Sequence, residues 1–278
     1  IDEEDSVSLD EKHYGDGAAH SDQLRIAVIR TPKLSNFTDF DALANEPDVA
    51  LYYVSTSREL GTPDLILLPG SKNTTEDLLY IRESGLEDAI RARVTEGTPL
   101  FGICGGYQML GRVVRDPLHT ESEHDETTGF GYLPIETSFA ATKRLRQVTA
   151  SADLPFLGAR IEGTGLSGYE IHMGETRFVE DIHRPFRIVS AAGMAVDLPD
   201  GAVSADGVVV GTYIHGVFDD DDFRRALLNR LRVRCGREEL PVQYRYRAAK
   251  ERAYDRLAET VRTSLDMEKL REIVEGDR

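Results

Sequence analysis

The feature that most constrains this chain is a glycine-flanked cysteine directly after a short apolar run. Cys104 lies in Gly-Ile-Cys-Gly-Gly, which follows Pro-Leu-Phe and precedes the helix-compatible residues 107–110. A buried strand that ends in such a turn and continues into a helix pushes the sulfur out of the sheet, and small glycines tolerate the crowded backbone. A helix N-terminus favours thiolate over thiol. The pattern predicts a cysteine nucleophile, and a buried core cysteine in a tight turn is the alternative.

Composition limits the class of protein. The 278 residues carry a formal net charge of −16, which argues against nucleic acid or an anionic membrane as the main partner. No apolar run approaches the length of a membrane span, and no signal-peptide pattern opens the chain. Two cysteines, Cys104 and Cys235, cannot build a disulfide framework, and no Cys/His cluster has metal-site spacing. We therefore expect a cytoplasmic protein without a metal site. The first residue, Ile1, suggests a piece cut from a longer polypeptide.

Apolar runs alternate with helical patterns along the first half of the chain. Residues 1–23 are polar and acidic and are predicted to be an interdomain linker, which leaves one domain over 24–278. The helical segment 75–94 is expected to break at Ser84-Gly85. Buried parallel strands are expected at 24–29, 49–54, 65–68 and in the run before Cys104. This alternation predicts an α/β fold with an open, mostly parallel sheet and helices on both faces.

In the second half of the chain, apolar runs and helical patterns alternate less regularly. Residues 116–126 are polar and predicted to form a loop, and residues 222–231 are predicted to form a helix. A last helix carries an apolar stripe and is expected to pack on the core as a surface helix. That stripe consists of Tyr254, Leu257, Ala258, Val261 and Leu265. Further strands are expected at 130–135, 169–178, 186–189 and 208–214.

A cysteine nucleophile needs a base, and His215 is the best placed of the seven histidines. It ends the apolar run 208–214 and is followed by Gly216. The carboxyl ends of strands in an open parallel sheet line a common ligand crevice. His215 is therefore predicted to take or share the Cys104 proton. A hydrogen-bonded structural histidine at a strand end is the alternative.

Two glycines and a glutamine complete the predicted centre. Gly70 closes the strand 65–68, and its N–H together with that of Gly105 would form an oxyanion hole. Gln108 lies one helical turn beyond Cys104 and suits hydrogen bonding to an amide-bearing substrate.

The segment 168–174 supplies further candidates. The strand period places Glu170 and His172 on one face and Tyr169 on the other. We expect these three residues to contact the substrate, and a solvated strand face is the alternative.

Taken together, these segments resemble the class I, or triad, glutamine amidotransferases, and more closely their cobyric acid synthase branch. The acidic residues 3–9 resemble the junction between the two domains of that family. The resemblance implies a class I, flavodoxin-like amidotransferase fold. The segments that carry it, in order, are 35–40, 68–74, 102–111, 168–174 and 211–216.

The resemblance implies a glutaminase half. Cys104 would attack the side-chain amide of glutamine and form a γ-glutamyl thioester, with His215 shuttling protons. Gly70 and Gly105 would stabilise the oxyanion, and Gln108 would help to hold glutamine. An N-terminal domain of the same polypeptide would use ATP and Mg to activate corrinoid carboxylates in cobalamin biosynthesis. No cofactor is expected in this chain itself.

One position departs from the triad pattern. Triad enzymes usually place a glutamate two residues after the histidine, and this chain has Val217 there. His215 would then work in a dyad, or be oriented by Asp219, by Glu170 or by a carboxylate of the other domain. A histidine without such a partner is a poorer base, so weak glutaminase activity, raised by the partner domain, is expected.

Other functions stay open at this point. A sister amidotransferase, such as cobyrinate diamide synthase or the lipid II amidating subunit, would share the elbow and the strand-end histidine. A non-catalytic binding module on the same fold would retain the architecture alone. A cysteine hydrolase of the related elbow-bearing α/β folds would act on peptides or esters.

Overall fold

A parallel sheet forms the centre of the molecule, as predicted. The computed structural model describes residues 22–276, and the expected linker, 1–23, lies almost wholly outside this range. The strand order is β13-β14-β6-β4-β1-β3, in which β13 is antiparallel to β14 and the other neighbours are parallel. These strands are β1 (Leu24–Ile29), β3 (Val49–Val54), β4 (Leu65–Leu68), β6 (Leu100–Ile103), β13 (Ala202–Val203) and β14 (Val209–Thr212).

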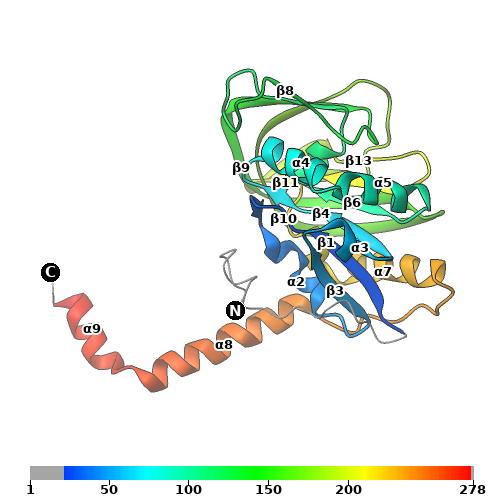
Figure 1. Ribbon diagram of the computed structural model, residues 1–278. Coiled ribbons are helices and arrows are strands. Elements are labelled where there is room, and N and C mark those ends of the chain that lie inside the picture. Colours follow the sequence, from blue (N-terminus) through cyan, green and yellow to red (C-terminus); the bar gives the residue numbers. More distant parts are fainter. Residues whose placement is uncertain (1–21, 277–278) are drawn as a thin grey trace.

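Helices cover both faces of this sheet (Figure 1). On one face α4 (Thr74–Glu83) and α5 (Leu86–Thr95) share a buried apolar cluster with β1 and β4, and on the other face α7 (Asp221–Arg234) does the same. The chain breaks between α4 and α5 as predicted, because Gly85 adopts a φ of 73° that disfavours other residues. The shorter helices are η1 (Phe37–Phe40), α2 (Asp41–Ala44), α3 (Ser57–Leu60), α6 (Gly105–Met109) and η2 (Val217–Asp219).

A second, largely antiparallel sheet goes beyond the predicted architecture. Its long hairpin pairs β9 (Ile135–Phe156) with β10 (Ala159–Phe178). The prediction of a strand over 130–135 is wrong, because residues 130–134 form an irregular segment and β9 begins only at Ile135. Alternate residues are buried along part of β9, a period of two that the sequence analysis did not use: Val148, Ala150, Ala152 and Leu154. The remaining strands are β2 (Leu34–Ser35), β5 (Gly70–Ser71), β7 (Val113–Arg115), β8 (Glu126–Thr128), β11 (Phe186–Ala191) and β12 (Met194–Asp200).

The long hairpin is joined to the parallel sheet at the end of β14. The Tyr169 N–H donates to the His215 carbonyl at 3.2 Å, and the His215 N–H donates to the Tyr169 carbonyl at 2.8 Å. Hairpin residues such as Phe156 and Leu166 share one buried cluster with Leu24 of β1. The hairpin therefore belongs to the same core, and β10 passes over the strand ends where the reacting groups were predicted.

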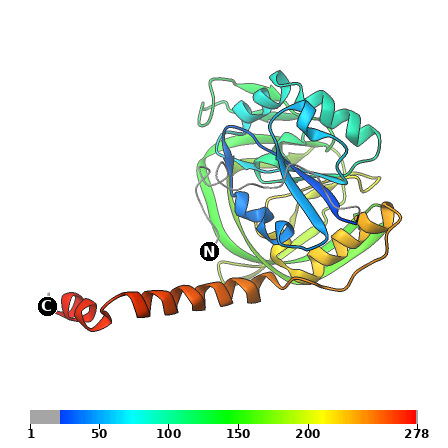
Figure 2. The ribbon, with the colours of Figure 1, turned by 60° about the horizontal axis from the view of Figure 1, so that its bottom comes forward.

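The C-terminal helices contradict the prediction of a packed surface helix. α8 (Tyr246–Ser264) and α9 (Met267–Glu275) leave the body as an extended arm, which Figures 1 and 2 both show. Tyr246 is the buried residue of α8, and α9 has none. The amphipathic pattern was read correctly, but the body of the described chain does not cover it. No helix within residues 22–276 has the length and apolar character needed to cross a membrane.

Candidate active site

Cys104 occupies a strained turn between β6 and α6, as its glycine-rich surroundings predict. Its φ is 52° and its ψ is −108°, a conformation that costs energy for a residue with a side chain. The neighbouring glycines have no room for a Cβ. A Cβ on Gly102 would lie 2.7 Å from the Gly106 carbonyl carbon, and one on Gly106 would lie 2.1 Å from the Leu68 carbonyl oxygen. The close packing of α6 on β4 and β6 holds the elbow in place.

The cysteine faces a small polar cavity of about 250 Å³. Its sulfur lies 3.3 Å from the Ile171 carbonyl oxygen of β10, and the residue is 7% exposed. The cavity is lined by Ser35, Asn36, Ser71, Lys72, Thr74, Cys104, Gln108, Glu121, Ile171, His172 and Met173.

His215 is fully buried beside Cys104 and is bound to a carboxylate. Its Nδ1 lies 2.7 Å from Oδ2 of Asp39, and the other Asp39 oxygen accepts the Gly216 N–H at 2.8 Å. The Asn36 amide nitrogen lies 3.2 and 3.1 Å from the two ring nitrogens, and the Tyr169 ring stacks on the imidazole at 4.9 Å. His215 is thus fixed through Nδ1 by Asp39 and lies between the Asn36 amide and the Tyr169 ring.

The charge balance around His215 favours its protonated form. Burial lowers the pKa of the imidazole, but the charge of Asp39 and the hydrogen-bonded Cys104 sulfur outweigh burial and raise it to about 10. A cationic imidazole next to the sulfur stabilises a thiolate. The pair is therefore suited to nucleophilic attack, followed by proton donation to a leaving group.

Asp39 is the functional residue that the sequence analysis missed. None of the orienting groups considered for His215 occupies that place. Glu170 instead accepts from Arg146 Nε at 2.5 Å, and Val217 is buried in the apolar core. The Asp219 carboxyl lies next to Gly216, and burial followed by the nearby charge of Asp39 raises its pKa to about 7. Asp39 follows β1 at the same sheet edge as Cys104 and His215, and that placement was the available signal.

The two predicted oxyanion glycines lie beside the reacting groups. A Cβ on Gly70 would approach His215 Cε1 to 3.3 Å, and one on Gly105 would approach the Ser71 backbone nitrogen to 2.9 Å. The short β2–β5 pairing sets Ser35 opposite Gly70. The backbone at Gly70 and Ser71 therefore borders the space in front of Cys104.

Gln108 lines the cavity, but its amide is already held by protein groups. Its Oε1 accepts from the Thr74 hydroxyl at 2.9 Å, and its Nε2 donates to the Tyr213 hydroxyl at 3.2 Å. Gln108 thus shapes the cavity wall in a fixed orientation. Thr74 and Tyr213, which the sequence analysis did not single out, supply that orientation.

The three candidates from segment 168–174 separate in the structure. His172 lines the cysteine cavity, with Nδ1 2.9 Å from the Gly174 carbonyl oxygen and its ring stacked on Tyr213 at 3.9 Å. Glu170 lines a neighbouring cavity of about 350 Å³ instead, and Tyr169 is not among the residues that line the cysteine cavity. Direct substrate contact stays a prediction for both, because Glu170 lines a cavity that His172 lines as well, and the Tyr169 ring stacks on His215.

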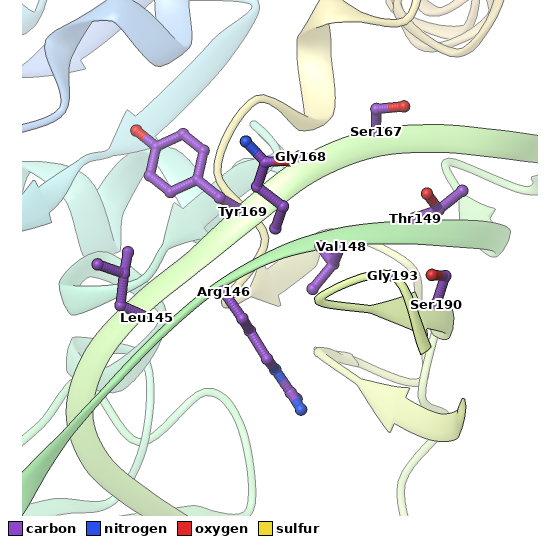
Figure 3. A pocket seen from close by; sticks show the side chains of 10 residues that line it. Leu145, Arg146, Val148, Thr149, Ser167, Gly168, Tyr169, Ser190 and Gly193 are labelled. Carbon is purple, nitrogen blue, oxygen red and sulfur yellow. The ribbon is translucent and has the colours of Figure 1, made fainter. Parts of the chain in front are cut away.

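A larger hollow of about 750 Å³ lies on the hairpin (Figure 3). It is lined by Leu145, Arg146 and Thr149 of β9 and by Gly168 and Tyr169 of β10, the strand that pairs directly with β9. Neither Cys104 nor His215 lines this hollow, so size alone is a poor guide to the reacting centre here. We assign the chemistry to the smaller cavity, because the strained Cys104 lines it and the buried, carboxylate-bound His215 lies beside that cysteine.

Comparison with known proteins places the chain in a family. The CobB/CobQ-like glutamine amidotransferase domain matches residues 25–223. Curated relatives called cobyric acid synthase include those of Streptococcus sanguinis (47% identical), Moorella thermoacetica (44%) and Dehalococcoides mccartyi (43%). These matches cover 99%, 99% and 100% of this chain and 53%, 53% and 54% of the respective relatives, so the chain spans about half their length. The solved structure of PurLQS from Thermotoga maritima is 18% identical with a TM-score of 0.56, covers 75% of this chain and 99% of its own, and bears out the fold.

Proposed function

Because this chain belongs to the CobB/CobQ-like glutamine amidotransferase domain family, we propose that it is the glutamine-hydrolysing part of a cobyric acid synthase and supplies ammonia for amidation of corrinoid carboxylates. The observation that carries the proposal is the chain of contacts from Cys104 to His215 to Asp39 at the carboxyl end of a parallel sheet. Identity of 43–47% to three cobyric acid synthases over nearly the whole chain favours this branch over the sister amidotransferases.

The reaction follows from the groups at the centre. The Cys104 thiolate attacks the side-chain carbonyl carbon of glutamine. The resulting oxyanion accepts hydrogen bonds from the N–H group of Gly105 and from the N–H groups of the Gly70–Ser71 backbone. The imidazolium of His215 gives a proton to the leaving nitrogen, which departs as ammonia and leaves a γ-glutamyl thioester. Water then attacks the thioester, His215 takes up the proton of the water, and glutamate leaves.

The cavity also offers opposite charges for the two ends of the amino acid. Lys72 lines it and can hold the α-carboxylate of glutamine, and Glu121 lines it and can hold the α-ammonium. Burial raises the pKa of the Glu121 carboxyl to about 7, although it accepts the Thr74 N–H at 3.0 Å. Glu121 is therefore only partly charged near neutral pH and becomes a stronger ammonium ligand as the pH rises.

This charge state gives a testable pH dependence. We expect the KM for glutamine to fall as the pH rises from 6 to 8 through the Glu121 pKa of about 7. Glu121→Gln should raise the KM on the order of tenfold and remove most of that pH dependence. Steady-state ammonia release measures both effects. Glu123→Gln, in the same loop but exposed to solvent, is the matched control. A KM for the native chain that is constant between pH 6 and 8 would contradict the assignment.

A glutamine-analogue electrophile tests the proposed function directly. We expect selective alkylation of Cys104 at neutral pH, protection by glutamine, and loss of labelling in Cys104→Ser, read by mass spectrometry. Cys235 is an internal control, because burial and then the carboxyl of Asp64 raise the pKa of its thiol to about 11. Equal labelling of both cysteines, or none, would favour a non-catalytic binding module.

The other half of the longer protein completes the proposed reaction. We place ATP- and Mg-dependent activation of the corrinoid acceptor there, and no step of glutamine hydrolysis above requires either. The expectation of weak activity rested on a histidine without a carboxylate partner, and Asp39 removes that reason. Any stimulation by the other half must then act through binding or positioning rather than by supplying the orienting carboxylate.

A further inference from the structure

The arm formed by α8 and α9 exposes a continuous set of apolar side chains. Leu257 and Val261 on α8 are 44% and 38% exposed, and Ile273 and Val274 on α9 are 64% and 70% exposed. We call the exposed apolar residues of both helices the arm stripe. The arm stripe consists of Tyr254, Leu257, Val261, Leu265, Met267, Leu270, Ile273 and Val274. On α8 the spacing of three and four residues keeps them on one face.

The opposite face of α8 is polar. Arg252, Arg256 and Thr263 lie there, about half a turn away from the arm stripe, and all three are exposed. A helix with one apolar and one polar face is suited to a partner on its apolar side only. Because the body of the described chain does not cover the arm stripe, the covering surface belongs to another part or another molecule.

The start of the arm, at residues 244–246, is hydrogen-bonded to the body near Cys104 and His215. The buried Tyr246 donates its N–H to the Asp221 carboxylate at 3.0 Å, and the buried Arg224 donates to the Tyr244 carbonyl at 2.7 Å. Asp221 begins α7, only six residues after His215 in the chain. A partner seated on the arm is thereby held to the segment that carries the proposed base.

The similarity to known proteins indicates which surface covers the arm stripe. The amidotransferase domain shared by the family ends at residue 223, before the arm begins at Tyr246. The similarity to the cobyric acid synthases continues over 99% of this chain, arm included, and those proteins are about twice as long. The arm is therefore shared with these longer proteins and lies outside the matched domain.

We propose that the arm stripe docks on the other half of the longer polypeptide, through an apolar groove on that half, and holds it against the glutaminase. The inference rests on the proposed function, because that half is the consumer of the ammonia. Docking buries the apolar faces of both α8 and α9 and gives the arm the partner that the body does not provide.

Hydrogen–deuterium exchange on the full-length protein tests the docking. We expect amides of residues 254–274 to be protected, and Leu257→Glu combined with Val261→Glu to speed their exchange on the order of tenfold or more, since each buried apolar anchor is worth about a factor of ten in affinity. Thr263→Glu also adds a negative charge to α8, but on the polar face, and should leave the protection unchanged. Rapid exchange in the native protein, or equal effects of both variants, would overturn the proposal.

A second measurement identifies the occupant. Light scattering on the full-length protein should give the same mass for the native protein and for the Leu257→Glu, Val261→Glu variant. A native dimer that this variant converts to a monomer would assign the arm stripe to a second copy of the chain and would refute docking within one polypeptide.

Activity assays on the double variant can refute the docking proposal without refuting the proposed function. In the double variant we expect glutamine-dependent amidation to fall on the order of tenfold, while amidation with free ammonium salt and glutamine hydrolysis stay within a factor of about two of the native protein. Unchanged glutamine-dependent amidation would overturn the docking. Absence of glutamine hydrolysis in the native full-length protein would instead refute the proposed function, and the exchange measurement would still decide the docking.

Discussion

Asp39→Asn is expected to lower kcat/KM for glutamine hydrolysis on the order of 10²- to 10⁴-fold, as loss of the orienting carboxylate does in related catalytic arrangements. The physical reason is that Asp39 both holds the imidazole through Nδ1 and supplies the negative charge that keeps His215 protonated. Asparagine retains the size of the side chain but removes the charge. The KM should change much less than kcat, because Asp39 is not among the residues that line the glutamine cavity.

The pH profile distinguishes an orienting role from a structural one. In the native chain the descending limb of kcat/KM at high pH reflects loss of the His215 proton, whose pKa is raised to about 10. Asp39→Asn should move that limb to lower pH, because the charge that raises the pKa is gone. Asp219→Asn is the control, since it removes a nearby half-buried carboxyl group that does not bind the imidazole. Equal profiles for the native chain and Asp39→Asn would favour a Cys–His dyad.

The contact between His215 and Asp39 also predicts how the stability of the fold changes with pH. A histidine whose pKa is raised on folding contributes stability that is complete below its unfolded value of about 6.5 and is lost as the pH rises towards 10. The difference in Tm between the native chain and Asp39→Asn should therefore be largest near pH 6 and shrink by pH 10. Thermal unfolding at both pH values measures it. A difference that grows with pH would contradict the ion pair.

Gly106→Ala is expected to destabilise the fold by about 2–3 kcal/mol, or roughly 5–10 °C in Tm. Gly106 needs no unusual backbone angle, so the whole cost is crowding. Its added Cβ would lie 2.1 Å from the Leu68 carbonyl oxygen and 2.8 Å from the Leu68 Cβ. Both atoms belong to the last residue of β4, which is packed in the core and cannot move aside. The helix α6 must therefore move away from the sheet. That movement would also shift the Gly105 N–H and lower glutaminase activity.

A second glycine serves as the control for this substitution. Gly131 has a φ of 74°, but no atom lies within 4 Å of the position that a Cβ would take, so Gly131→Ala costs only backbone strain of about 1 kcal/mol. Thermal unfolding of both variants separates crowding from strain. If Gly106→Ala were no less stable than Gly131→Ala, the tight contact between α6 and β4 would not be what holds the elbow.

The sequence was most informative where the chemistry is local. The elbow around Cys104 could be predicted because glycines on both sides of a nucleophile report a crowded turn within a few residues. The parallel strands could be predicted because each is a short apolar run buried on both faces. His215 could be predicted because it stands at the end of such a run, and the carboxyl ends of neighbouring parallel strands meet at one edge.

The predictions from sequence that failed mostly concern contacts between segments far apart in the chain. Asp39 is separated from His215 by 176 positions in the chain, and nothing in its local sequence pairs it with that histidine. The start of β9 was predicted wrongly because the irregular segment 130–134 contains apolar residues that are typical of a strand. The periodicity of the last helix was read correctly, but an apolar stripe does not say which surface will cover it.

The sequence by itself determined the elbow cysteine, the parallel sheet and the strand-end histidine, because backbone sterics and hydrophobic periodicity act between residues close in the chain. Only the tertiary structure decided which carboxylate binds His215, which residues of segment 168–174 line the cavity, and that the last helices stand away from the body. Those outcomes depend on how separate elements pack at one sheet edge, and packing is settled by the summed contacts of the whole core rather than by any single segment.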